Sequence, residues 1–161
     1  IGSLPGDTDI SNLRYGKICI LADADSDGLH IATLLCALFL RHYKNLVTSG
    51  KIFVSMPPLY RIDAAKEVFY ALDENEKESI VKKIKKQNSK IKIDIQRFKG
   101  LGEMNPSQLR ETVMKPESRR LVQLTLSSSD NANSVFDLLL SKKRAPDRKE
   151  WLEKKGNLAE I

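Results

Sequence analysis

Long apolar runs, cysteine and internal repeats are what this sequence has least of. No apolar run approaches the roughly 20 residues that a membrane-spanning helix needs. The longest, residues 31–40, is interrupted only by Thr33 and fits a buried helix. The two cysteines, Cys19 and Cys36, lie inside apolar segments without metal-ligand spacing, which predicts buried, reduced thiols. These features exclude a membrane span and a disulfide framework.

The first residues also lack the basic and apolar regions of a signal peptide, and no methionine stands at position 1. We therefore expect an interior part of a longer protein. Residues 1–15 are rich in Gly, Ser, Asp and Asn without a hydrophobic period, which predicts a linker. The 161 residues, 41% hydrophobic and 30% charged, suffice for one domain with a small appendage.

The chain carries a net charge of +6, which favours polyanionic partners, nucleic acid first among them. A solvated face explains any single cation equally well. Basic residues that could follow a DNA backbone are Arg61, Arg97, Lys99, Arg110, Arg119, Arg120, Lys142, Lys143, Arg144, Arg148 and Lys149.

A strand, a helix and a second strand are predicted early in the chain. Residues 17–22 form a short continuous apolar run, typical of a strand buried on both faces. Residues 29–47 read as a long, mostly apolar helix that ends near Gly50, where glycine supplies a left-handed cap. Residues 51–55 form the second strand. This order predicts a right-handed βαβ unit and a parallel sheet.

Further elements are predicted along the rest of the chain. Residues 59–63 and 67–72 suit a hairpin, and 73–87 a charged helix with Asp73 as its N-cap. Asn105, Pro106 and Gln108 form a strong helix start. Residues 91–98 look extended, 119–126 strand-like, and 130–141 and 146–155 helical.

Three carboxylates, Asp23, Asp25 and Asp27, alternate directly after the first strand and before the long helix. This is the carboxyl end of a strand in an open α/β sheet, where ligands bind. Three carboxylates so close repel one another unless a cation lies among them, and hard oxygen ligands favour Mg²⁺, Mn²⁺ or Ca²⁺. Mg²⁺ with few carboxylates and several waters suits phosphoryl transfer.

Three other interpretations of these aspartates compete. An EF-hand loop starting at Asp23 would need Glu at its twelfth position, where Leu34 stands, and a helix before it. In an aspartyl-phosphate phosphatase, Asp23 would be the nucleophile and Asp25 the acid. Aspartates can also simply cap a helix, although one suffices for that.

Residues 97–104, Arg-Phe-Lys-Gly-Leu-Gly-Glu-Met, are the second chemical feature. Two glycines after two cations let backbone amides and Lys99 approach a phosphate, although a plain turn is equally possible. Arg97 and Lys99 are therefore candidate phosphate contacts. His30, one turn into the long helix and beside the aspartates, is a third candidate.

Three blocks carry a family resemblance: residues 21–31 (Leu-Ala-Asp-Ala-Asp-Ser-Asp-Gly-Leu-His-Ile), 56–61 (Met-Pro-Pro-Leu-Tyr-Arg) and 96–106 (Gln-Arg-Phe-Lys-Gly-Leu-Gly-Glu-Met-Asn-Pro). In this order they resemble the TOPRIM region and following segment of the B subunits of bacterial type IIA DNA topoisomerases. The similarity runs over nearly the whole chain and is weakest over residues 74–94. The aspartate block and the compact length resemble topoisomerase IV more than gyrase.

The resemblance implies an α/β TOPRIM fold, Rossmann-like, with helices flanking a parallel sheet and a small helical C-terminal appendage. It divides the chain into a linker (1–15), a TOPRIM core (16–63), a hairpin with a charged helix (64–95) and a C-terminal segment (96–161). It implies Mg²⁺, replaceable by Mn²⁺ or Ca²⁺, on Asp23, Asp25 and Asp27. Its implied partners are DNA and an A subunit in an A2B2 heterotetramer, without a membrane, in the cytoplasm at the nucleoid.

The family's mechanism uses a tyrosine of the A subunit to cut both DNA strands, and ATP drives the whole enzyme. Tyr15, Tyr43, Tyr60 and Tyr70 do not match that nucleophile. The family's Glu-Gly-Asp-Ser-Ala block, which supplies a catalytic Glu, is absent here, as are the ATPase and transducer regions. We therefore expect the first TOPRIM strand to be missing, which leaves a sheet edge open. By itself such a piece would neither hydrolyse ATP nor cleave DNA. The alternative interpretation of its function is a docking module for the A subunit, inert as an isolated piece.

Overall fold

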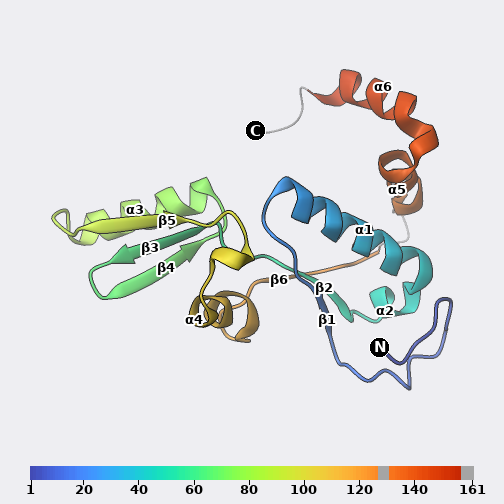
Figure 1. Ribbon diagram of the computed structural model, residues 1–161, viewed down its shortest axis with the longest axis horizontal. Helices are drawn as coiled ribbons and strands as arrows, with labels where there is room; N and C mark the ends of the chain where they lie inside the picture. Colours follow the sequence, from blue (N-terminus) through green and yellow to red (C-terminus); the bar gives the residue numbers. More distant parts are fainter. Residues whose placement is uncertain (127–130, 157–161) are drawn as a thin grey trace.

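Two small three-stranded sheets organise the chain. The computed structural model describes residues 1–126 and 131–156 (Figure 1). One sheet has the strand order β1-β2-β6 and the other the order β4-β3-β5, and they lie next to each other along the long axis of the molecule. The predicted α/β class is confirmed, although among the described strands only β1 and β2 pair in parallel. No helix of the described part is long and apolar enough to cross a membrane.

The first sheet contains the predicted βαβ unit. β1 (Ile18–Ile20) pairs in parallel with β2 (Ile52–Ser55), and α1 (Ser26–His42) and the short α2 (Lys44–Thr48) connect them. Gly50 has φ +67°, the left-handed conformation expected after the helix. Ile20, Phe39, Leu46 and Ile52 are buried together between α1 and the sheet, so α1 covers this face because its apolar residues recur at helical spacing.

The sheet is mixed and not wholly parallel. β6 (Leu121–Gln123) pairs antiparallel with the free side of β2, and β1 is an edge strand that only β2 joins within the described residues. An apolar run in the sequence indicates that a strand is buried but not in which direction it runs. β6 is antiparallel to β2 because the chain comes back from the second sheet alongside β2. The Met56 amide marks that return, donating to the Arg120 carbonyl at 2.9 Å.

Two burial predictions are wrong. Cys19 is exposed, because alternate residues of a strand point to opposite faces and α1 covers only the face of Ile20. The apolar run 31–40 is only half buried: the side chains of Ile31, Leu34 and Leu38 lie on the outer face of α1, and these residues are 52%, 45% and 43% exposed.

The second sheet is antiparallel throughout. β3 (Tyr60–Ala64) and β4 (Glu67–Ala71) form the predicted hairpin, and β5 (Ile93–Arg97) pairs with the other side of β3. α3 (Glu74–Gln87) packs on this sheet, burying Ile84 against Ile62. Asp73 caps α3 as predicted, its carboxylate accepting from the Glu76 amide at 2.8 Å. The predicted extended segment is thus a strand of a sheet whose pairing the sequence did not reveal.

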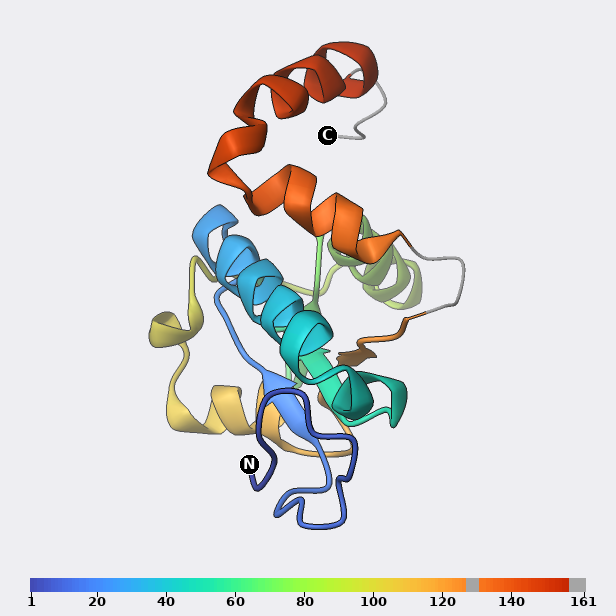
Figure 2. The same ribbon diagram turned by 90° about the vertical axis from the view of Figure 1, so that its right-hand side faces the viewer.

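The C-terminal part is helical, as predicted. A 3-10 turn (Leu101–Glu103), α4 (Pro106–Leu109) and a π-helical turn (Arg110–Met114) precede β6. α4 begins with the expected capping box, in which Asn105 and Gln108 each accept from the other's backbone amide at 2.9 Å. α5 (Ala132–Leu140) and α6 (Ala145–Lys155) follow, and α5 lies against α1 (Figure 2). Asp130, the predicted start of α5, lies outside the described residues.

Residues 1–15 contain no regular element and lie against the first sheet's unit. The Gly6 amide donates to the His42 carbonyl at 2.8 Å, and the Asn45 side chain donates to the Asp7 carbonyl at 2.8 Å. Ile10 and Leu13 pack against the apolar core beside α1.

Candidate metal-binding site

The aspartate loop runs from the end of β1 into α1. Asp25 is the N-cap of α1, and its carboxylate accepts from the Gly28 amide at 2.7 Å. The helix therefore begins at Ser26, three residues earlier than predicted, because Asp25 supplies the cap and Asp27 lies in the first turn. The helix start inside the loop, together with β1 before it, excludes the EF-hand.

Gly28 fixes the path of this loop. The residue is buried, and a Cβ built on it would lie 2.1 Å from the backbone oxygen of Asp23. Any side chain here would collide with backbone, which cannot turn aside as a flexible side chain can. Gly28 thus lets the first turn of α1 rest directly on Asp23.

Asp23 joins the two chemical features of the sequence. Its carboxylate accepts from the Leu101 amide at 2.7 Å, across 78 positions of the chain. A Cβ on Gly100 would lie 3.1 Å from the carboxylate atoms of Asp23, so a glycine lets the loop approach this closely. The aspartate loop and the loop of residues 99–102 therefore form one structure.

The third block, residues 56–61, packs against the two loops where they meet. Phe98 is 2% exposed, and its amide donates to the Leu59 carbonyl at 2.8 Å. Ala24, Pro57, Phe98 and Leu101 line a small gap where the three blocks meet. The three blocks that carry the family resemblance thus meet in space.

The predicted metal ligands are exposed carboxylates at this junction. Asp23 and Asp25 each give one oxygen to a backbone amide, and Asp27 accepts no hydrogen bond within the described residues. No three His, Cys, Asp or Glu residues of the described part lie close enough to form a ready-made metal cluster. Mg²⁺ commonly takes one or two carboxylates and keeps its waters. The donors present fit that kind of site.

The three predicted phosphate contacts are exposed but differ in place. His30 lies in the early part of α1, near the aspartates. Lys99 lies next to Gly100, and its amide donates to the Glu103 carboxylate at 2.8 Å. Arg97 is the last residue of β5 and pairs with Tyr60 of β3. Hydrogen bonds from Lys77 and Tyr60 lower the pKa of the Glu74 carboxyl most, and the positive charge of Arg97 lowers it further. Arg97 therefore lies beside the start of α3.

Several predicted DNA contacts are engaged elsewhere. Arg61 binds Asp63 at 2.8 Å, and Arg144 binds Asp147 at 2.6 Å. Arg148 donates to the Ser141 carbonyl at 2.7 Å. Such pairs satisfy the guanidinium groups within the chain, which weakens the expectation that these arginines track a DNA backbone.

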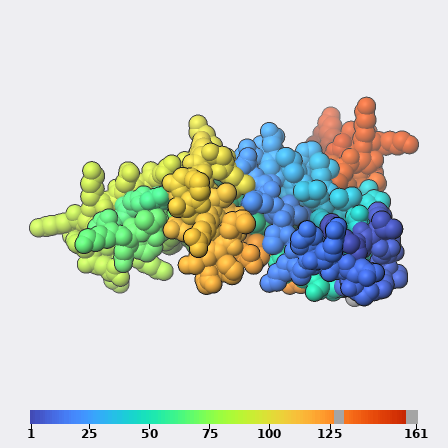
Figure 3. All heavy atoms as spheres, turned by 60° about the horizontal axis from the view of Figure 1, so that its bottom comes forward, coloured from blue at the N-terminus to red at the C-terminus, as the bar shows by residue number. Residues whose placement is uncertain are grey.

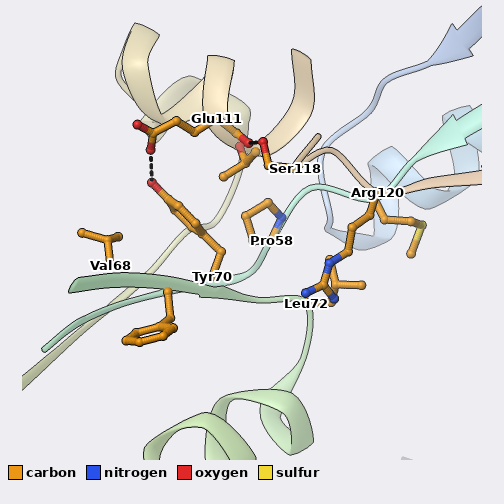
Figure 4. A pocket seen from close by; sticks show the side chains of 10 residues that line it. Pro58, Val68, Tyr70, Leu72, Glu111, Ser118 and Arg120 are labelled. Carbon is orange, nitrogen blue, oxygen red and sulfur yellow. Dashed lines mark hydrogen bonds between the residues drawn. The ribbon is translucent and has the colours of Figure 1, made fainter. Parts of the chain in front are cut away.

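A second cleft lies between β4 and the segment after α4 (Figure 4). The Tyr70 hydroxyl donates to the Glu111 carboxylate at 3.3 Å across it. At its other end Arg120 donates to both carboxylate oxygens of Glu76, at 2.7 and 2.9 Å. The cleft has a volume of about 270 Å³. These two contacts tie the second sheet's unit to the segment between α4 and β6, which leads into the strand that completes the first sheet.

The Glu76–Arg120 pair predicts a pH-dependent contribution to stability. Arg120 lowers the pKa of the Glu76 carboxyl, burial opposes this, and the Leu72 amide adds to the lowering. A lowered folded-state pKa stabilises the fold above the unfolded value of about 4.3, and this stabilisation is lost as the pH falls through the folded value. Both side chains are partly exposed, so we expect Glu76→Gln to cost about 1 kcal/mol at pH 7.

Urea unfolding of both forms between pH 7 and pH 3 measures this difference, which should vanish at the acid end. Glu78→Gln is the matched control, since Glu78 makes only an exposed 3.3 Å pair with Lys82 on the same helix. An equal cost for both substitutions, or a pH-independent cost for Glu76→Gln, would contradict the assignment.

Comparison with known proteins places the chain in a family. The family model described as the carboxyl terminus of the DNA gyrase B subunit matches residues 90–153. The B subunit of DNA topoisomerase 4 from Pseudomonas aeruginosa is 62% identical over 161 residues, which is all of this chain and 26% of that protein. Its counterpart from Escherichia coli K12 is 60% identical over 163 residues, again 26% of its length.

A gyrase relative is less similar. The B subunit of DNA gyrase from Thermotoga maritima is 43% identical over 148 residues, covering 92% of this chain and 22% of that protein. The chain thus spans about a quarter of the length of the curated relatives it matches. The higher identity to topoisomerase IV agrees with the residues of the aspartate block. The chain belongs to the family of bacterial type IIA DNA topoisomerase B subunits, on its topoisomerase IV side.

Proposed function

We propose that this chain is the part of a type IIA topoisomerase B subunit that binds Mg²⁺ where DNA is cut and resealed. The contact between Asp23 and Leu101 carries the proposal, because it brings the metal-type carboxylates and the phosphate-type glycine loop to one place. Neither feature alone is specific. Joined, they offer hard oxygen ligands beside backbone amides and Lys99, the donors that a DNA phosphate needs.

The chain's own residues hold this site rigid. The Leu101 amide fixes one oxygen of Asp23, and the Gly28 amide fixes one oxygen of Asp25. The remaining oxygens face solvent together with Asp27, whose carboxylate is exposed. A bound Mg²⁺ would stabilise negative charge on the scissile phosphate and on the leaving 3′ oxygen. Lys99 and His30 would contact neighbouring phosphates, with Arg97 further along the DNA.

The nucleophile is proposed to come from a tyrosine of an A subunit. Burial, followed by the Glu111 charge, raises the pKa of Tyr70, and a hydrogen bond to Glu74 raises the pKa of Tyr60. A raised pKa disfavours the phenolate that attacks a phosphate. The whole enzyme would be an ATP-dependent A2B2 heterotetramer in the cytoplasm at the nucleoid, with residues 16–63 as its TOPRIM core and 96–161 as the C-terminal segment.

Reconstitution tests the proposal. The intact protein containing this sequence, mixed with its A subunit, ATP and Mg²⁺, should unlink catenated DNA circles and relax supercoiled plasmid. EDTA should abolish both activities, and Mn²⁺ should restore cleavage. Full activity in EDTA would refute the metal role, and no activity with any A subunit would refute the topoisomerase role.

A docking module for the A subunit is the second candidate function. The observation that favours it is the stripe of Ile31, Leu34 and Leu38 on α1, three large apolar side chains on one exposed helix face. Such a stripe is typical of a contact surface. On this hypothesis the chain should still capture the A subunit in EDTA, and Leu34→Glu should weaken that capture. Capture that requires Mg²⁺ would argue against it.

A further inference from the structure

We propose that the end of the second sheet remote from the aspartate loop is a second contact for duplex DNA, separate from the metal site. We call this end the lysine tip and define it as Lys66, Lys82, Lys83, Lys85, Lys86, Lys90 and Lys92. The partner class, DNA, rests on the proposed function. The contact would hold DNA that flanks the cleavage position and not the scissile phosphate.

The charge of the lysine tip is concentrated in a short stretch. Six of the residues 82–92 are lysine and none is acidic. All seven tip lysines are exposed. The chain has 27 lysines and arginines among its 161 residues, so an even distribution would place about two of them in a stretch of this length.

The fold gathers the tip from three segments. The β3–β4 turn holds Lys66, and pairing of Ala64 with both Glu67 and Ile93 puts this turn beside the start of β5. α3 ends at Gln87, and the chain returns to β5 through Lys90 and Lys92. Figures 1 and 3 show this end projecting away from α1 and the aspartate loop.

Local structure does not account for these lysines. In the described residues Lys82 pairs with Glu78 at 3.3 Å, and the other six take part in no ion pair. The acidic groups facing the tip are Glu67 and Asp94, with Asp63 already bound to Arg61. The helix dipole favours Lys85 and Lys86 in the last turn of α3, but not the lysines beyond the helix.

The side-chain chemistry selects a DNA backbone among polyanions. The tip has no aromatic residue for stacking on single-stranded bases. It also has no exposed apolar face for insertion into a lipid surface, since Ile84 is buried and Ile91 half-buried. Lysine is a point charge that binds phosphates without fixed geometry. Exposed lysines spread along an edge therefore suit sequence-independent contact with duplex phosphates.

The length of β5, which separates the lysine tip from the aspartate site, determines which part of the bound DNA the tip can contact. β5 connects the tip to the loop of residues 99–102. Five strand residues at about 3.3 Å each span about 17 Å, or about five base pairs at 3.4 Å. DNA that leaves the aspartate site along β5 would meet the tip about half a helical turn away.

The test uses the reconstituted A2B2 enzyme and two duplexes of about 10 and about 30 base pairs, one and three helical turns, so that only the longer duplex extends beyond the roughly five base pairs that separate the tip from the aspartate site. The variant Lys83→Ala/Lys85→Ala/Lys86→Ala/Lys90→Ala removes four exposed charges, and the same four Lys→Arg substitutions are the matched control. Binding is measured from 50 to 300 mM salt, with thermal melting to verify the fold.

We expect the alanine variant to bind the longer duplex at least about tenfold more weakly at 0.1 M salt. Its slope of log affinity against log salt should fall by roughly 0.9 for each lost phosphate contact. The shorter duplex should be bound as by the wild type, and the arginine variant should be unchanged on both. An unchanged slope, an equal loss on both duplexes, or loss of the A2B2 assembly with DNA binding intact would each overturn the proposal.

The readouts separate this inference from the proposed function. Decatenation by the wild type tests the function, whereas length-dependent DNA binding tests the tip. A wild type that binds but never cleaves, with a variant that loses only long-duplex binding, would refute the function and keep the tip.

Discussion

Replacing Asp25 with asparagine in the intact protein is expected to lower Mg²⁺-dependent DNA cleavage by at least about 100-fold while the fold is retained. Asparagine is as good an N-cap as aspartate, so its side-chain oxygen still accepts from the Gly28 amide, which Asp25 binds at 2.7 Å. Only the negative charge is removed. Losing one preorganised electrostatic contact in such a site typically costs two to three orders of magnitude in rate. Plasmid cleavage with the A subunit measures the effect.

Asp73 offers a matched control on the same chain. It caps α3 as Asp25 caps α1, accepting from the Glu76 amide at 2.8 Å, but it precedes α3 at the second sheet. Asp73→Asn should therefore leave cleavage and thermal stability near the wild-type values. Cleavage by the Asp25→Asn enzyme at the wild-type rate would show that Asp25 is a cap alone. An equal loss in both variants would attribute the effect to helix capping and not to the metal.

Gly28→Ala is expected to be the most damaging single methyl addition near the site. The new Cβ would lie 2.1 Å from the Asp23 oxygen and 2.7 Å from its carbonyl carbon, so α1 must shift. Overpacking of this kind costs typically 1–3 kcal/mol, and we expect about 3 kcal/mol because backbone is the obstacle. The shift would also pull Asp23 from the Leu101 amide, so metal binding should fall together with the unfolding midpoint in urea.

Gly102→Ala is the control, because a Cβ there meets nothing within 4 Å. Its free energy of unfolding should stay within about 0.5 kcal/mol of the wild type, the usual range for surface changes. If Gly28→Ala were equally mild, the close packing of α1 on the aspartate loop would be wrong.

Local chemistry explains which parts of the fold could be predicted. Asp73 and Asn105 sit at helix starts because their short side chains satisfy backbone amides within three residues. The hairpin follows from two β-prone runs separated by residues 64–66, and the structure extends the first strand through Ala64, which leaves Ala65 and Lys66 as the turn. Gly50 at the end of α2 is predictable since left-handed backbone favours glycine. Each signal acts between residues that are close in sequence.

The unpredicted features depend on partners far along the chain. To predict that β5 pairs with β3 and β6 with β2, one must know which apolar segments meet in space. The hydrophobic periodicity of a segment does not give that information. The same holds for Cys19, whose exposure reflects the lack of a second covering layer among the described residues.

In the candidate site, too, the features that depend on neighbouring residues were predictable, and the contact between distant residues was not. The aspartate spacing predicted an acidic loop between β1 and α1, and the structure places it there. The contact of Asp23 with Leu101 had only one sequence signal, Gly100, a glycine not required by its extended backbone. A glycine whose backbone conformation any residue could adopt indicates that another group lies too close for a side chain. Here that group is the Asp23 carboxylate.

The central claim is that Asp23 and Asp25 bind a divalent metal. Electron paramagnetic resonance of Mn²⁺ titrated into the nucleotide-free intact protein tests it most directly, with wild type, Asp23→Asn/Asp25→Asn and Asp73→Asn compared. We predict that the double variant loses at least about tenfold in Mn²⁺ affinity at this site and that Asp73→Asn matches the wild type. Equal Mn²⁺ binding by all three proteins would contradict the claim.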